Sequence, residues 1–347
     1  MSNLKIHLFY ALSIVVIGAA ALLYLNHGSN NAVSSSVPPA TTLPPANAPD
    51  ATADGYKLTC QAGYNMIKPI LSVNQEHEFN GFSPLKAKIM NVVEDNKRTG
   101  LLSSASVYLF NFSDGKWLSV NPAEAYNPGS LIKLPLLISL LKESETDPAV
   151  LSKKITFNDQ AAIPTQTFNS NAIKKGNSYS VKELMHYMIA YSDNNATKLL
   201  NNTVVVKDFV KTFTDLNLPE PNVKDANYQI TAKNYSDFFI ALYYATYLSK
   251  NSSESAMELL SQCDFKDGFV KELPSAIKVA HKFGEWGDNR MGIHEMHESG
   301  VVYLSNRPYL LTVMTKGNNS KDLATVVSKI SKLVFDEFSP EGSVAQN

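Results

Sequence analysis

The order of strand-like and helix-like segments predicts an α+β fold built on one antiparallel sheet. Strand patterns occur early in the chain, a long helical stretch follows from Ser130 to about Leu260, and further strand patterns precede an amphipathic helix at Leu323–Phe338. Strands at both ends of a helical region suggest that the first and last strands pair with each other. We therefore expect a mixed domain in which helices flank a single antiparallel sheet.

Local sequence signals justify the individual helices and hairpins. Ser83 followed by Pro84 predicts a helix that runs to Val93, because proline is favoured at the first helical position. A capping box formed by Ser180 and Glu183 opens another helix. Two hairpins are predicted where apolar runs flank short turn sequences, Ala105–Phe112 with Lys116–Val120 and Val301–Leu304 with Tyr309–Thr315.

The amino terminus predicts a membrane anchor. The apolar run Leu8–Leu25 would span roughly 27 Å as a helix, which is close to the thickness of a bilayer core. It is longer than the apolar part of a cleaved signal peptide, and Lys5 is the only charged side chain nearby. We expect residues 1–25 to be a cytoplasmic stub and a signal anchor, with the rest of the chain extracytoplasmic, either periplasmic or on the cell surface.

Composition sets the remaining bounds. Residues 26–55 are rich in Pro, Ser and Ala and predict a linker, so the working domain is 56–340, followed by a short tail at 341–347. With 31 basic and 32 acidic residues the net charge is −1, which argues against a nucleic-acid partner. Two cysteines, Cys60 and Cys263, are too few for a disulfide scaffold or a thiolate metal cage. Whether they pair, and the oligomeric state, stay open.

A candidate nucleophile lies at the start of the helical stretch. In Asn127-Pro128-Gly129-Ser130-Leu131-Ile132-Lys133, the three-residue offset places Ser130 and Lys133 on one face. A serine needs a base within reach, and a lysine becomes a base when burial depresses its pKa. The apolar sequence after Lys133 favours such burial. However, Ser-x-x-Lys occurs six times in this chain, so the motif alone says little.

Two later motifs strengthen the case. The helix opened by Ser180 runs out at Ser192-Asp193-Asn194, and a strand-like alternation ends in Lys282-Phe283-Gly284, where glycine allows the backbone to approach a ligand. In this order, the three motifs resemble those of the penicillin-recognising serine hydrolases, in their class A β-lactamase-like branch, over about residues 80–335. The resemblance implies an antiparallel sheet flanked by helices plus an all-helical lobe, with the site between them.

The resemblance also implies a role for each motif residue. Ser130 would be the acylated nucleophile, Lys133 its base or proton relay, and Ser192 the donor of a proton to the leaving nitrogen. Lys282 would add positive potential beside Ser192 and the substrate carboxylate, and Asn194 would hydrogen-bond the amide side chain of the substrate. Asp193 would hold the loop in shape. The backbone N–H groups of Ser130 and Glu285, the latter just past Gly284, would form the oxyanion hole.

Two departures from the family pattern bear on activity. Phe283 replaces a threonine whose hydroxyl helps to bind the substrate carboxylate. The family's deacylating glutamate, with Asn four residues on, has no good counterpart in Leu218–Thr231. Glu220 has Lys224 four residues later, and Glu220 and Asp225 are most simply solvated loop acids. Glu220 is therefore only a weak candidate for the deacylation base.

The remaining histidines do not predict a metal site. His294 and His297, with Glu295 and Glu298, lack the spacing of a helical zinc motif, so we assign them to a polar loop before the late hairpin. His281 should point away from Lys282 and be a hydrogen-bonded structural residue. We expect neither a metal nor a cofactor.

The sequence thus predicts an anchored, exported serine hydrolase that forms an acyl-enzyme on a β-lactam or related amide and deacylates slowly. One alternative is a D,D-peptidase or penicillin-binding protein acting on peptidoglycan stem peptides. The other is a non-catalytic envelope binding module on the same fold.

Overall fold

The computed structural model describes residues 52–53, 55–64, 66–158, 167–203, 206–221, 228–288, 291–305 and 307–339. The predicted anchor at Leu8–Leu25, nearly all of the linker and the tail after residue 340 lie outside the described residues. Within the described part, no helix combines the length and the apolar character needed to cross a membrane.

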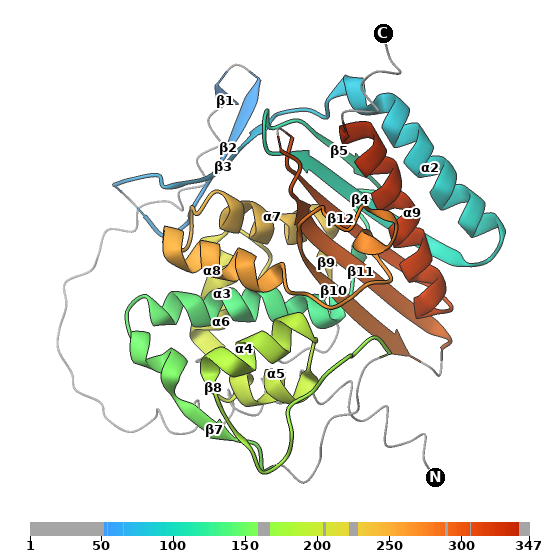
Figure 1. Cartoon of the computed structure of the whole chain (residues 1–347). Helices are drawn as coiled ribbons and strands as arrows, with labels where there is room; N and C mark the ends of the chain where they lie inside the picture. The colour runs from blue at the N-terminus through green and yellow to red at the C-terminus, as the bar shows by residue number, and fades with distance from the viewer. Residues whose placement is uncertain are drawn as a thin grey trace.

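A five-stranded antiparallel sheet forms the centre of the domain (Figure 1). Its strand order is β10-β11-β12-β4-β5, and β12 pairs with β4 from Tyr309 opposite Asn111 to Gly317 opposite Leu102. The prediction that early and late strands share one sheet is therefore confirmed. The strands are β4 (Leu102–Asn111), β5 (Trp117–Val120), β10 (Val279–Asp288), β11 (Ile293–Val302) and β12 (Tyr309–Gly317).

Helices cover both faces of this sheet. The face that carries α2 (Ser83–Arg98) and α9 (Ser320–Phe338) encloses one apolar core, and α7 (Ala232–Tyr243) packs on the opposite face. A helical lobe continues from α7 and encloses the second core (Figure 1). Its other helices are α3 (Lys133–Ser144), α4 (Val181–Ala190), α5 (Asn194–Asn201), α6 (Val206–Asp215) and α8 (Lys250–Leu260).

Short elements complete the domain. A small sheet precedes the first helix, with strands β1 (Thr52–Ala53), β2 (Tyr56–Cys60) and β3 (Ile70–Gln75). There are also two-stranded pairs, β6 (Ala125–Tyr126) with β9 (Ile230–Thr231) and β7 (Lys154–Thr156) with β8 (Ser178–Ser180). Of these strands, β7, β8 and β9 interrupt the stretch predicted as helical. The 3-10 turns are η1 (Asn80–Phe82), η2 (Gly129–Ile132), η3 (Pro148–Ser152) and η4 (Phe269–Glu272).

One segment differs clearly from the sequence prediction. His294, Glu295, His297 and Glu298 lie on β11, which begins at Ile293 rather than near Val301, so their assignment to a loop is wrong. All of them except His294 are buried. Their hydrogen-bond partners come from distant parts of the chain, and polar residues with such partners can occupy a strand interior. The cysteines left open by the sequence, Cys60 and Cys263, are both free.

Candidate active site

The Ser130 turn is fitted closely against strand β10. Gly129 has a positive φ of 51°, and a Cβ atom there would lie 2.4 Å from the carbonyl oxygen of Glu285. A Cβ on Gly284 would lie 2.6 Å from the carbonyl oxygen of Pro128. Glycine is thus required on both sides of this contact. The contact brings the backbone of η2, which carries the buried Ser130, against the Gly284–Glu285 part of β10.

Two buried side chains of β11 hold the residue that precedes this turn. The Asn127 N–H donates to Glu295 Oε2 (2.9 Å), and the Asn127 carbonyl accepts a hydrogen bond from His297 Nε2 (3.0 Å). His297 Nδ1 accepts from the Thr315 N–H, which fixes the proton on Nε2. These two residues, which the sequence placed in a loop, therefore position the start of the Ser130 turn.

Lys133 is buried and has three hydrogen-bond partners. Its Nζ lies 2.6 Å from the Ser192 carbonyl oxygen, 3.0 Å from Ser192 Oγ and 2.8 Å from Asn194 Oδ1. Burial and the nearby Lys282 ammonium lower the pKa of Lys133 well below its ordinary value, and the Asp193 carboxylate opposes the shift. When Lys133 is neutral, only the Ser192 hydroxyl among these three partners can donate a proton to it.

The Ser192 hydroxyl lies between two lysines. Lys282 Nζ is 3.0 Å from Ser192 Oγ and 2.8 Å from the Phe283 carbonyl oxygen. Burial lowers the pKa of Lys282 to about 8, while the negative charges of Cys263 and Glu298 oppose the shift. Ser192 has a φ of 55°, an uncommon conformation for a non-glycine residue. Strain of this kind is characteristic of positions that the surrounding structure fixes for function.

Asp193 shapes the loop that carries Ser192. One carboxylate oxygen accepts from the Asn195 N–H (2.8 Å) and caps α5, and the other accepts from the Ile173 N–H (2.7 Å). Asn194 is the first residue of α5, and its side chain reaches Lys133. The loop is thus tied both to α3 and to the segment that contains Ile173.

Phe283, Gly284 and Glu285 are consecutive residues of β10, and the side chains of Phe283 and Glu285 contact different partners. The Phe283 ring is 1% exposed, stacks on Phe265 with centroids 4.5 Å apart, and contacts Phe168 at 6.3 Å. Glu285 Oε1 accepts from the Thr167 hydroxyl (2.6 Å), and Oε2 accepts from the Thr167 N–H (3.1 Å). The Phe283 side chain is therefore in the core, while the Phe283 carbonyl accepts the hydrogen bond from Lys282.

Sequence reasoning did not identify the segment that starts at Thr167. Besides its contacts with β10, Asn169 Nδ2 donates to the Tyr191 carbonyl (2.9 Å), just before Ser192. The segment therefore links β10 to the Ser192 loop. Its residues carry no motif of their own, and they find their partners only when distant parts of the chain meet.

Glu220 stands apart from these contacts. Its side chain is exposed, and the neighbouring Pro219 carbonyl accepts a hydrogen bond from Tyr228. Asp225 and Lys224 lie outside the described residues. Among the residues that the structure describes, no three His, Cys, Asp or Glu side chains are arranged to hold a metal ion.

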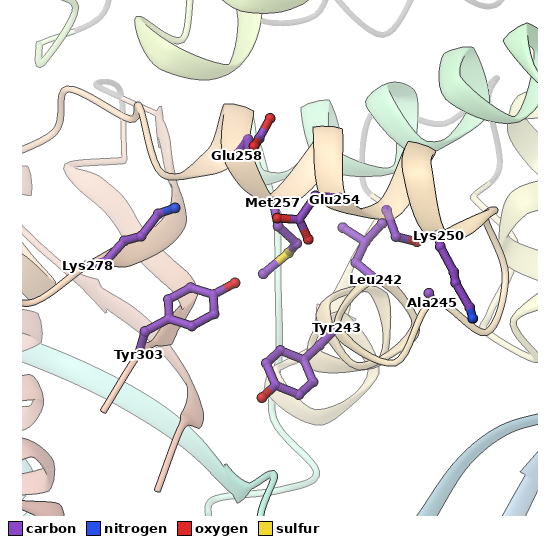
Figure 2. Close-up of a pocket in the computed structure, with 10 residues that line it drawn as sticks. Leu242, Tyr243, Ala245, Lys250, Glu254, Met257, Glu258, Lys278 and Tyr303 are labelled. Carbon is purple, nitrogen blue, oxygen red and sulfur yellow. The ribbon is translucent and has the colours of Figure 1, made fainter. Parts of the chain in front are cut away.

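A separate pocket of about 360 Å³ opens between α8, the end of α7 and the segments next to β10 and β11 (Figure 2). In Figure 2 the Tyr303 hydroxyl points toward Met257, and Lys278 extends from the same side of the pocket as Tyr303. Neither Ser130 nor any of its motif partners lines this pocket. We therefore do not assign the predicted chemistry to it.

Comparisons with known proteins agree on the fold. A family model described as the beta-lactamase enzyme family matches residues 84–338. The chain is 24% identical over 275 residues to beta-lactamase VEB-1 of Pseudomonas aeruginosa, which covers 73% of this chain and 90% of that protein. The crystal structure of the extended-spectrum beta-lactamase TLA-3 superposes with a TM-score of 0.64 at 20% identity, covering 74% of this chain and 98% of that one. PBP-A superposes with a TM-score of 0.60 at 20% identity, covering 74% and 96%.

A sheet packed against a helical lobe, with a serine followed one turn later by a buried lysine, defines a class of serine hydrolases that act on amides. This chain belongs to the beta-lactamase enzyme family. The fold and the family predicted from its three motifs are confirmed.

Proposed function

We propose that this protein is an exported, membrane-anchored serine hydrolase that is acylated on Ser130 by β-lactams and releases the acyl group slowly. The observation that carries the proposal is the Ser192 hydroxyl, 3.0 Å from Lys133 Nζ and 3.0 Å from Lys282 Nζ, beside the turn that presents Ser130. A hydroxyl with an amine on each side can relay a proton between them.

The proposed acylation uses this relay. Ser130 Oγ attacks the substrate carbonyl and gives its proton to neutral Lys133. Backbone N–H groups of Ser130 and Glu285 stabilise the tetrahedral oxygen, since η2 and β10 pack directly against each other. Ser192 then passes a proton to the leaving nitrogen as the C–N bond breaks, and it recovers one from Lys133. Serine oxygen and carbonyl carbon remain bonded in the acyl-enzyme.

Slow release is proposed because the described residues offer no clear base for the deacylating water. The exposed Glu220 is the nearest candidate by sequence, and no described contact links it to Ser130, Lys133 or Ser192. The solved structure of a PBP-A mutant is an acyl-enzyme complex with penicillin G, so accumulation of such a species has a precedent on this fold.

A time course with the full chain in detergent tests the proposal. A fluorescent penicillin should label the protein, and intact mass should show one adduct that persists. Ser130→Ala should abolish labelling. Ser139→Ala is the matched control, because Ser139, on α3, is buried like Ser130 and starts another Ser-x-x-Lys. The lysine of that motif, Lys142, contacts Glu145 and the Tyr247 carbonyl instead. Labelling that survives Ser130→Ala would refute the assignment of the nucleophile.

The second candidate function, a D,D-peptidase acting on peptidoglycan stem peptides, is favoured by the same exposed position of Glu220. It predicts release of D-alanine from a stem peptide that ends in two D-alanines. A non-catalytic binding module remains the third candidate, suggested in the sequence by Phe283. It predicts binding of these compounds without any adduct on Ser130.

A further inference from the structure

A cluster of ionisable side chains is buried on the face of β10 opposite Ser192. His281 Nδ1 lies 2.6 Å from Glu298 Oε1, and both residues are at most 1% exposed. The second oxygen of Glu298 accepts from the Phe269 N–H at 2.8 Å. The free Cys263, 2% exposed, interacts with the same His281 ring. The mechanism proposed for Ser130 uses none of these three side chains.

The backbone around the cluster leaves space for it. A Cβ atom on Gly268 would lie 1.7 Å from Glu298 Oε2, and one on Gly300 would lie 2.5 Å from the His281 Cβ. Any other residue at these two places would displace the pair. An ion pair buried this deeply is seldom retained for stability alone, because apolar side chains of similar volume usually do as well. The burial of this pair therefore points to a role in placing charge near neighbouring groups.

The charges of the cluster depend on one another. Burial lowers the pKa of His281, but Cys263 and Glu298 raise it more, to about 10. Burial raises the pKa of the Cys263 thiol, yet His281, Lys282 and the Phe265 N–H together bring it below its ordinary value. Contact with Glu298 and Cys263 therefore favours the charged form of the His281 imidazole, and the His281 charge in turn favours the thiolate of Cys263.

We propose that Cys263, His281 and Glu298 form a thiolate–imidazolium–carboxylate cluster whose net negative charge is the counter-charge that holds the Lys282 ammonium beside Ser192. Two buried anions then balance two buried cations, His281 and Lys282. The cluster consists of positioning residues, since it touches neither substrate nor Ser130. The expected effect on acylation rests on the proposed function, whereas the charge state of the cluster does not.

The other groups around Lys282 do not supply this charge. Ser192 offers a neutral hydroxyl, the Phe283 carbonyl is a dipole, and the Phe283 ring lies 4.1 Å from Nζ. From α3, the nearby Lys133 is a cation or a neutral amine. Asp193, near Lys133, is hydrogen-bonded to the Ile173 and Asn195 N–H groups. The anions that act on Lys282 come from Cys263, before η4, and from Glu298 on β11.

The test compares an isosteric pair of variants at Cys263. Cys263→Asn removes one of the two anions that raise the pKa of Lys282. The alkaline limb of the acylation–pH profile should therefore move down, by about one pH unit for the loss of one buried charge. Acylation at pH 8.5 should then fall up to tenfold. Cys263→Asp restores an anion of similar size and should keep the wild-type limb. Cys60→Ser is the matched control for loss of a cysteine.

Identical alkaline limbs for the Asn and Asp variants and the wild type would overturn the proposal, because a merely structural role does not distinguish a charge from its neutral isostere. A second measurement needs neither acylation nor a stable Asn or Asp variant. Thiolate absorbance near 240 nm at pH 7 should be present in Cys60→Ser and lost in Cys60→Ser/Cys263→Ser; its absence from Cys60→Ser would refute the thiolate. If the wild type is not acylated at all, the proposed function fails while this absorbance still decides the cluster.

Discussion

Replacement of Lys282 by methionine should make the free energy of unfolding less dependent on pH. At pH 7 it should slow acylation without destabilising the fold. Lys282 is fully buried, and burial sets its pKa at about 8 instead of 10.5. The folded protein therefore releases this proton at a lower pH than the unfolded chain does. Since the unfolded chain binds more protons between these values, this lysine makes the wild type gain stability as pH rises from about 8 to 10.5.

The size of the effect follows from the same values. Keeping Lys282 charged in the folded state at pH 7 costs about 3 kcal/mol. Its two hydrogen bonds, to Ser192 Oγ and the Phe283 carbonyl, return about 1 kcal/mol each. Lys282→Met should thus be at least as stable as the wild type at pH 7. At pH 10 it should be about 1 kcal/mol less stable, because pH 10 lies below the unfolded pKa and part of the cost of the charge remains.

Urea unfolding at pH 7, 8, 9 and 10 measures this crossing of the two stability curves. Lys329→Met, which removes an exposed lysine from α9, is the control for the loss of one positive charge. At pH 7 the Lys282→Met protein should also be acylated much more slowly by a fluorescent penicillin. A difference in unfolding free energy that stays constant from pH 7 to 10 would refute the argument that Lys282 is charged at a cost in the folded protein.

Three further outcomes are expected. Lys133→Arg keeps the positive charge but cannot lose its proton, so acylation should slow by about 100-fold or more, and near-normal labelling would move the base elsewhere. Wild-type protein mixed with excess penicillin should give a burst followed by slow release, unchanged in Glu220→Gln; fast turnover without a burst, lost in that variant, would make Glu220 the deacylation base. The full chain should sediment with membranes through Leu8–Leu25, whereas a mature amino terminus after residue 25 would demonstrate cleavage.

The sequence predicted those parts of the site that have local signatures. Ser130, Lys133, Ser192 and Lys282 belong to short motifs, and the structure brings Lys133, Ser192 and Lys282 within hydrogen-bonding distance. The shared sheet was also predictable, because apolar runs and turn residues indicate a hairpin on each side of the helical stretch. The capping box at Ser180 and Glu183 is present as expected.

Contacts between distant residues had no such signature. Thr167 and Glu285 are 118 residues apart, and neither residue type indicates the other. The polar residues of β11 were assigned to a loop because burial of a charged side chain in a strand depends on partners that only the fold provides. For the same reason the sequence did not predict the cluster of Cys263, His281 and Glu298. Of these three residues, only His281 was expected to be a hydrogen-bonded structural residue.

Phe283 and Glu285, both on β10 after Lys282, contact the same segment. Phe283, where the family pattern has threonine, contacts Phe168, and Glu285 binds Thr167 through both carboxylate oxygens. The aromatic contact and the two hydrogen bonds therefore involve the adjacent residues Thr167 and Phe168. The presence of Phe283 is better explained by this packing than by the loss of a threonine hydroxyl. The segment joined to β10 in this way also reaches the loop of Ser192 through Asn169. At the position where the chain departs from the family motif, an aromatic contact therefore helps to join β10 to this segment, while the backbone of β10 contacts the Ser130 turn.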